Sequence, residues 1–261
     1  INIKPSVIAA VFGAEAVTIF SLASTLEGYV YTFSDAINGM FMPKISRILI
    51  QENTQERLSG LMIKVGKFHI YTIGLIYIGF LCFGKQFITL WMGDGYGEIY
   101  VCALLLIFPS LFDVPQQVAK TALLAKDVVK EQAIIYIGMA LSNIVLAAML
   151  LKKLGIVGGA VSICIAYLLK VVAMNLLYDK MLHVNLEKYF HDVYLRWAIV
   201  AGGSIICCIA INRKHLAEGW LGLCAKIVFM TIAYGLMLLE ICMEKEQRRH
   251  LVRLLKVKLK R

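Results

Sequence analysis

Long apolar segments separated by short charged connections dominate this sequence. Each segment has roughly 20 residues, the length that an α-helix needs to cross the ~30 Å hydrocarbon layer of a bilayer. With 60% hydrophobic and 17% charged residues among 261, the chain is too apolar to form a water-soluble core with a polar exterior. Strands of a membrane barrel would place polar residues at alternate positions, and the runs 70–83 and 101–108 lack them. The sequence therefore predicts an all-α, polytopic transmembrane helix bundle.

Charged residues, glycine and proline divide the bundle into about eight predicted spans. Because the chain begins without Met inside an apolar stretch, we expect it to be a fragment whose first span is truncated. The predicted bundle covers 1–243, and a basic tail at 244–261 follows it. The predicted spans are 1–12, 17–42, 68–92, 99–125, 132–151, 156–178, 193–211 and 221–243.

Lysine and arginine collect in alternate connections, around 43–67, 126–131 and 179–192, and in the tail. The positive-inside rule places such connections in the cytoplasm, so we expect a cytoplasmic C-terminus. The tail contributes strongly to the net charge of +10 and alternates basic with apolar residues. That pattern is typical of a helix on an anionic leaflet or of a solvated topology anchor. No aromatic platform accompanies the charge, so the expected partner is the lipid bilayer and not nucleic acid.

A small set of polar residues lies inside the predicted spans, although an ionisable group at the centre of a span costs roughly 2.5 to 3.5 kcal/mol. We predict that these residues line a hydrophilic passage. Pro109 and Pro115 are hinge candidates, because proline removes a backbone hydrogen bond. Alternatively, Lys120, Lys170 and Asp113 pair with one another or extend to an interface. The candidate cavity residues are Asp35, Asn38, Asp113, Gln116, Gln117, Lys120, Asn143 and Lys170.

Motifs of catalysis and metal binding are missing from the sequence. It contains no GxSxG, HExxH or Walker loop, and its connections are too short to hold a catalytic domain. The seven cysteines lie in or beside apolar runs without a CxxC or His/Cys cluster, as expected of small hydrophobic residues at helix contacts. We therefore expect no enzyme activity, disulfide, metal or cofactor. The class that remains is a transporter or channel.

Several loose motifs occur in a familiar order: FGAEAVTIFSLA at 12–23, MPKISR at 42–47, FGKQF at 83–87, WMG at 91–93, ALLAK at 122–126 and GIVGGAVS at 155–162. Their order resembles that of the polysaccharide flippases in the multidrug/oligosaccharidyl-lipid/polysaccharide exporter superfamily. The resemblance implies a two-lobed transporter of twelve to fourteen helices, of which this chain is the C-terminal half. It also implies a bacterial inner membrane, coupling to a proton or sodium gradient, and a polysaccharide polymerase and glycosyltransferases as partners.

The substrate that this resemblance implies is an undecaprenyl-pyrophosphate-linked oligosaccharide, flipped between leaflets during assembly of O-antigen, capsule or exopolysaccharide. Lys120 and Lys170 would then attract the pyrophosphate. Hydrogen bonds to sugar would come from Asp35, Asn38, Gln116, Gln117 and Asn143. One alternative is a cation-coupled multidrug antiporter of the same superfamily, which would use Asp35 and Asp113. Another is an integral-membrane polysaccharide polymerase.

Overall fold

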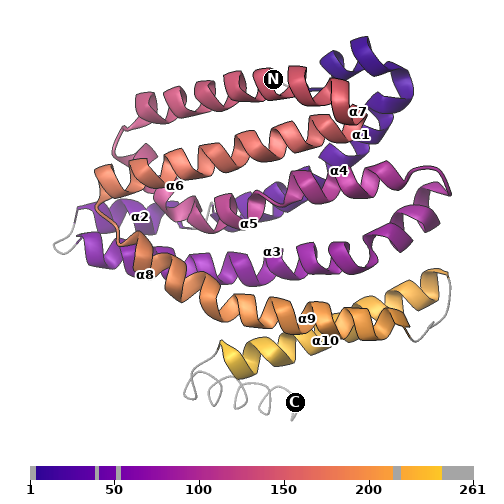
Figure 1. The fold of residues 1–261 in the computed structure, drawn as a ribbon. Helices are drawn as coiled ribbons and strands as arrows, with labels where there is room; N and C mark the ends of the chain where they lie inside the picture. The colour runs from indigo at the N-terminus through magenta and orange to yellow at the C-terminus, as the bar shows by residue number, and fades with distance from the viewer. Residues whose placement is uncertain (1–3, 39–40, 51–53, 214–218, 243–261) are drawn as a thin grey trace.

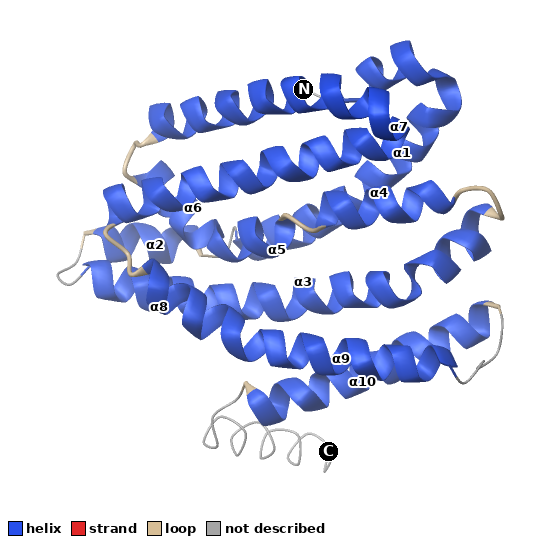
Figure 2. Cartoon of the chain, viewed as in Figure 1, coloured by secondary structure: helices blue, strands red, loops and turns tan. Residues whose placement is uncertain are grey.

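The computed structural model describes residues 4–38, 41–50, 54–213 and 219–242. Throughout these residues the chain is helical apart from short turns, and they contain no strand (Figure 2). The elements, including a 3-10 turn (η1) and a π-helical turn (η2), are α1 (Lys4–Asn38), α2 (Met42–Leu49), α3 (Thr54–Met92), α4 (Gly97–Ile107), α5 (Ser110–Asp113), η1 (Val114–Gln116), α6 (Gln117–Ala125), α7 (Val129–Leu182), α8 (Leu186–Phe190), η2 (His191–Leu195), α9 (Arg196–Arg213) and α10 (Trp220–Ile241).

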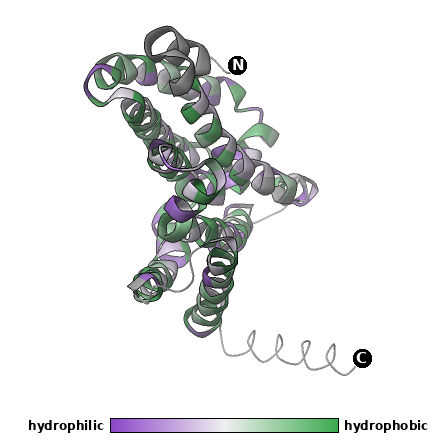
Figure 3. Ribbon diagram, turned by 90° about the vertical axis from the view of Figure 1, so that its right-hand side faces the viewer, coloured by the Kyte–Doolittle hydropathy of each residue, from purple (hydrophilic) through white to green (hydrophobic). Residues whose placement is uncertain are grey.

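Membrane-spanning character is clear in the described helices. Hydrophobic residues run along the helices in Figure 3, and many of the large ones are exposed, as lipid-facing side chains are. The stretches long and apolar enough to cross a membrane are Thr54–Met92, Gly97–Ala125, Val129–Leu182, Leu186–Asn212 and Trp220–Ile241. The chain is therefore a multi-pass membrane protein, and the prediction of an all-α helical bundle is confirmed.

Helix α7 folds back on itself at Gly155, where the backbone has φ 59° and ψ −140°. Glycine adopts this conformation freely, whereas a Cβ atom makes it costly. Figure 1 shows the two arms, 129–154 and 156–182, side by side and antiparallel. A Cβ atom on Gly158 would meet the Leu150 carbonyl, so small residues permit the tight bend. The sequence predicts separate spans at 132–151 and 156–178, and the bend lies between them.

Helix α1 continues through residues 13–15, where the sequence predicts a turn between two spans. Alanine and glutamate favour helix, and the single Gly13 costs only about 1 kcal/mol relative to alanine. Helix α1 therefore joins residues 4–12 of the first predicted span to residues 17–38 of the second in one helix. Similarly, α3 begins at Thr54, well before the predicted start at residue 68, because the charged segment preceding the apolar run is itself helical. The predicted tail at 244–261 lies outside the described residues.

Two prolines interrupt the predicted span 99–125. Helix α4 ends at Ile107, Pro109 precedes α5, and Pro115 lies in the 3-10 turn η1, before α6 resumes at Gln117. Since proline lacks the N–H that an α-helix needs, the helix breaks at these positions. The break brings Asp113 and Lys120 onto neighbouring short elements.

Helices α8, α9 and α10 pack against α3. Trp197 Nε1 donates a hydrogen bond to Tyr234 Oη (2.9 Å), which donates in turn to the Tyr71 carbonyl of α3 (2.8 Å). Gly74 lies directly beneath the Trp197 indole, so α9 approaches the α3 backbone closely. These contacts connect the C-terminal helices to the rest of the bundle.

The two ends of the bundle differ in charge. Helix α2, the start of α3, and the α6–α7 and α7–α8 connections share one end, which is at the left of Figure 1. The turn at Gly93–Gly95 and the bend at Gly155 lie at the other end. The connections in which the sequence concentrates lysine and arginine therefore meet at one end of the molecule.

Candidate functional site

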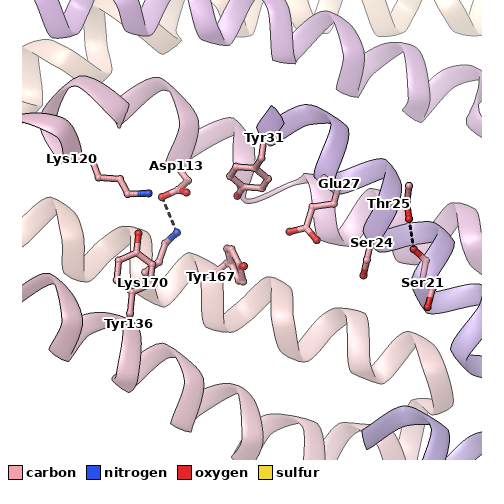
Figure 4. A pocket seen from close by; sticks show the side chains of 11 residues that line it. Ser21, Ser24, Thr25, Glu27, Tyr31, Asp113, Lys120, Tyr136, Tyr167 and Lys170 are labelled. Carbon is pink, nitrogen blue, oxygen red and sulfur yellow. Dashed lines mark hydrogen bonds and ion pairs between the residues drawn. The ribbon is translucent and has the colours of Figure 1, made fainter. Parts of the chain in front are cut away.

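A polar cavity of about 560 Å³ lies between α1, the broken helix α5–α6 and both arms of α7 (Figure 4). One face of α1 contributes hydroxyl groups and a carboxylate, α5 and α6 contribute one charged residue each, and α7 contributes two tyrosines and a lysine. The lining residues are Ser21, Ser24, Thr25, Glu27, Gly28, Tyr31, Asp113, Lys120, Tyr136, Tyr167 and Lys170. Within an otherwise apolar bundle, this concentration of polar groups identifies the candidate site.

An ion pair closes one side of the cavity. Lys170 Nζ lies 2.9 Å from Asp113 Oδ1, and the two side chains are only 3% and 14% exposed. The pair joins the second arm of α7 to α5. Lys170 Nζ also lies 4.8 Å from the ring centroid of Tyr167 and 5.5 Å from that of Tyr136, both within cation–π distance. Lys170 is therefore compensated by a carboxylate and two aromatic rings.

Lys120 extends into the same cavity from α6 (Figure 4). Its Nζ lies 5.8 Å from the ring centroid of Tyr136, and no carboxylate among the described residues is close enough to form an ion pair with it. A half-buried ammonium without a counter-ion attracts an anion strongly, because little water screens it. Lys120 is therefore the cation of this site best placed to meet an anionic ligand.

The α1 face of the cavity carries polar atoms that the described residues do not satisfy. Ser24 Oγ and Tyr31 Oη are buried without a hydrogen-bond partner in this part of the protein. Glu27, on the same helix face, is only 6% exposed, and its carboxylate points into the cavity. A buried hydroxyl without a partner costs about 1 to 3 kcal/mol, so such atoms indicate a polar occupant, either water or ligand.

Three of the predicted site residues, Asp113, Lys120 and Lys170, line this cavity. The alternative that the sequence left open, pairing between Asp113 and Lys170, describes their geometry. Two predicted residues lie beside the cavity without lining it: Gln117 Nε2 donates to Asp35 Oδ1 (3.2 Å), which joins α6 to α1. This bond fixes the position of α6 next to the site.

Of the remaining predicted residues, Gln116 and Asn143 do not line the cavity. Gln116 is buried at η1, and its Nε2 has no partner among the described atoms. Asn143 lies across the α7 hairpin from Ser162, whose Oγ is 3.1 Å from Asn143 Oδ1. The side chain of Asn38 lies outside the described part of the structure. The structure thus groups three predicted residues at one cavity, and Gln116 and Asn143 are not among the residues that line it.

The candidate cavity residues chosen from the sequence do not include the tyrosines of α7 or the hydroxyl-bearing face of α1. A usable signal existed on α1, because Ser21, Ser24, Thr25 and Gly28 recur at the 3-, 4- and 7-residue spacings of one helix face. Tyr167 and Lys170 are likewise three residues apart and share a face. Tyr136 offered no comparable signal, since its position depends on how α7 folds back.

Comparison with known protein families, with curated proteins and with solved structures finds no match to this chain. The chemistry of the cavity must therefore carry any functional assignment. Its formal charges are two lysines and two carboxylates, surrounded by hydroxyl groups. Such a site can hold a polar or charged ligand within the membrane.

Proposed function

We propose that this protein is a membrane transporter that moves an undecaprenyl-pyrophosphate-linked oligosaccharide between leaflets, as the second lobe of a flippase. The single observation that carries the proposal is the half-buried Lys120 ammonium, which has no ion-pair partner among the described residues and faces a polar cavity inside the bundle. A cavity of about 560 Å³ matches the size of ligand-binding sites in general. The order of the motifs between residues 12 and 162 supports the substrate class.

In this proposal, Lys120 binds the pyrophosphate, and the hydroxyl groups on α1 and α7 form hydrogen bonds with sugar. Ser24 and Tyr31 suit this role because their hydroxyls, without protein partners among the described residues, can both donate and accept. Lys170 contributes less, because Asp113 already compensates its charge. The same ion pair weighs against an antiporter in which Asp113 binds an organic cation.

The proposal is tested by deleting the gene and complementing it with variants, with surface polysaccharide measured on gels. Lys120→Gln should abolish or strongly reduce the polysaccharide at unchanged protein level, and Lys120→Arg should retain it. The matched control is Lys226→Gln, which removes a half-buried lysine on α10, a helix that does not line the cavity; its Nζ donates to Gln86 Oε1 (3.0 Å). Normal polysaccharide in the Lys120→Gln strain would contradict the assignment.

The deletion strain also separates the competing functions. A polymerase mutant would still display single repeat units, whereas a flippase mutant would display none. An antiporter mutant would become drug-sensitive with its polysaccharide intact. Either of those two results would replace the flippase proposal.

We further propose that the membrane is the bacterial cytoplasmic membrane and that the end bearing α2 faces the cytoplasm. The support is the gathering of basic connections at that end. Green fluorescent protein fused after residue 185 should fluoresce, because it would fold in the cytoplasm, whereas a fusion after residue 95 should not. The reverse pattern would refute this orientation.

A further inference from the structure

A second cavity, of about 460 Å³, lies between α2 and the first turns of α3. Four of its seven lining residues are cationic, and no carboxylate is among them. The lining residues are Lys44, Arg47, Ile48, Arg57, Gly60, Leu61 and Lys64. This cavity is separate from the polar cavity described above, with which it shares no lining residue.

Two amphipathic helices build this basic cavity. Helix α2 is eight residues long; Ile45 and Ile48 are buried against the bundle, whereas Lys44 and Arg47 are exposed. The short helix is thereby held with its basic side outward.

On α3, the 57–64 segment repeats the same division between a buried and an exposed face. Leu58 and Leu61 face inward, and Arg57, Gly60 and Lys64 recur at helical spacing on the outer face. A Cβ atom on Gly60 would meet nothing within 4 Å, so the glycine leaves the floor of the cavity open.

Three of the four positive charges in this cavity are not balanced by the described residues around them. No carboxylate within the described residues is close enough to pair with Lys44, Arg47 or Lys64. Gathering like charges around one hollow is unfavourable until an anion enters, and the anion then interacts with several cations at once. The arrangement therefore favours a compact, multiply contacted anion such as a phosphate group.

The position of the cavity indicates where that phosphate comes from. It lies at the end of the bundle that carries α2, the start of α3 and the basic connections (Figure 1). Large exposed apolar side chains lie close in sequence to its cations: Ile50, three residues after Arg47, is 85% exposed, and Phe68, one turn beyond Lys64, is 52% exposed. A ligand bound here would have cations around its head and apolar surface beside its tail.

We propose that this basic cavity binds the phosphate headgroup of an anionic phospholipid, with the acyl chains lying along α3. The proposal does not depend on the transport function, because it uses neither the polar cavity nor its residues. A lipid bound here would hold α2 against α3 at the membrane surface.

Native mass spectrometry of the purified full chain in a neutral detergent would test this proposal, because it resolves individual bound lipids. The chain is titrated with phosphatidylglycerol and, as the uncharged reference, with phosphatidylcholine of the same acyl chains. Each cation near a phosphate contributes about 1 kcal/mol, or about fivefold in affinity. The variant Lys44→Gln/Arg47→Gln/Lys64→Gln should therefore weaken the tightest phosphatidylglycerol site by about a hundredfold.

Two further variants distinguish loss of the basic cavity from a general loss of positive charge and from misfolding. Lys130→Gln/Lys180→Gln/Lys188→Gln removes three exposed cations from the same end and should leave the tightest site unchanged. Gly60→Leu keeps every charge, fills the cavity and improves helix propensity by about 1 kcal/mol, so it should fold and still lose the site.

Three results would overturn the proposal: undiminished phosphatidylglycerol binding in the basic-cavity triple variant, an equal loss in the control triple variant, or normal binding by Gly60→Leu. The last measurement is a competition between inorganic phosphate and phosphatidylglycerol. If inorganic phosphate displaced phosphatidylglycerol at equal concentration, the site would be one for free phosphate, and the lipid assignment would be wrong.

Discussion

The ion pair between Lys170 and Asp113 makes a sharp prediction about stability. At 2.9 Å, two unit charges attract each other by about 6 kcal/mol at an effective dielectric constant of 20. Much of this attraction offsets the cost of removing both charges from water. Lys170→Met should therefore reduce the free energy of unfolding by about 3 to 5 kcal/mol, because it leaves a carboxylate that is 14% exposed without its partner.

A double-mutant cycle distinguishes this pairing from simple loss of packing. Asp113→Leu alone should also be strongly destabilising, because it leaves the Lys170 ammonium buried. The double variant Lys170→Met/Asp113→Leu should recover most of the loss, since apolar groups replacing a buried pair are often neutral or stabilising by about 1 to 4 kcal/mol. Equilibrium unfolding by dodecyl sulfate in mixed micelles, followed by circular dichroism, measures all four proteins. Additive effects of the two single changes, or losses below about 1 kcal/mol, would refute the reasoning.

Two glycines make further predictions by the same unfolding measurement. Gly74→Ala should destabilise the chain by about 1 to 3 kcal/mol because its Cβ would overlap the Trp197 indole, with ring atoms at 2.7 Å, whereas Gly79→Ala has open space and should be neutral or stabilising. Gly155→Ala should cost about 1 to 3 kcal/mol because of its φ of 59° and ψ of −140°, and should loosen the α7 hairpin in spin-label distances between its arms. A tolerated Gly74→Ala, or an unchanged arm separation with Gly155→Ala, would contradict these assignments.

The sequence predicted those helices that are marked by residues within the helix itself. Apolar runs of membrane-spanning length identify α3, α7 and α10, and the prolines mark where the helix preceding α6 breaks. The start of α3 was not predictable from apolarity, because its first turns carry charges on one face while leucines on the other are buried. An apolar-run criterion detects where lipid surrounds a helix, and a helix can begin before that point.

The site was partly predictable for an energetic reason. An ionisable residue inside a span is costly enough to require a partner or a cavity, which singled out Asp113, Lys120 and Lys170. The partner of each was not predictable, because pairing depends on how α5 and the second arm of α7 align. Asn143 illustrates the same limit: its neighbour Ser162 is brought opposite by the bend at Gly155.

The charge balance of the polar cavity constrains how it could handle a pyrophosphate. Lys120 is the cation without a carboxylate partner among the described residues, whereas Lys170 is held by Asp113. A pyrophosphate carries more negative charge than one ammonium compensates, so under the proposed function its binding would draw Lys170 away from Asp113. The carboxylate on α5 and the incoming anion would then compete for the same ammonium, and this competition would weaken binding of the proposed substrate. Weak binding suits a transporter, because a fully unpaired second lysine would hold the anion too tightly for release at the opposite leaflet.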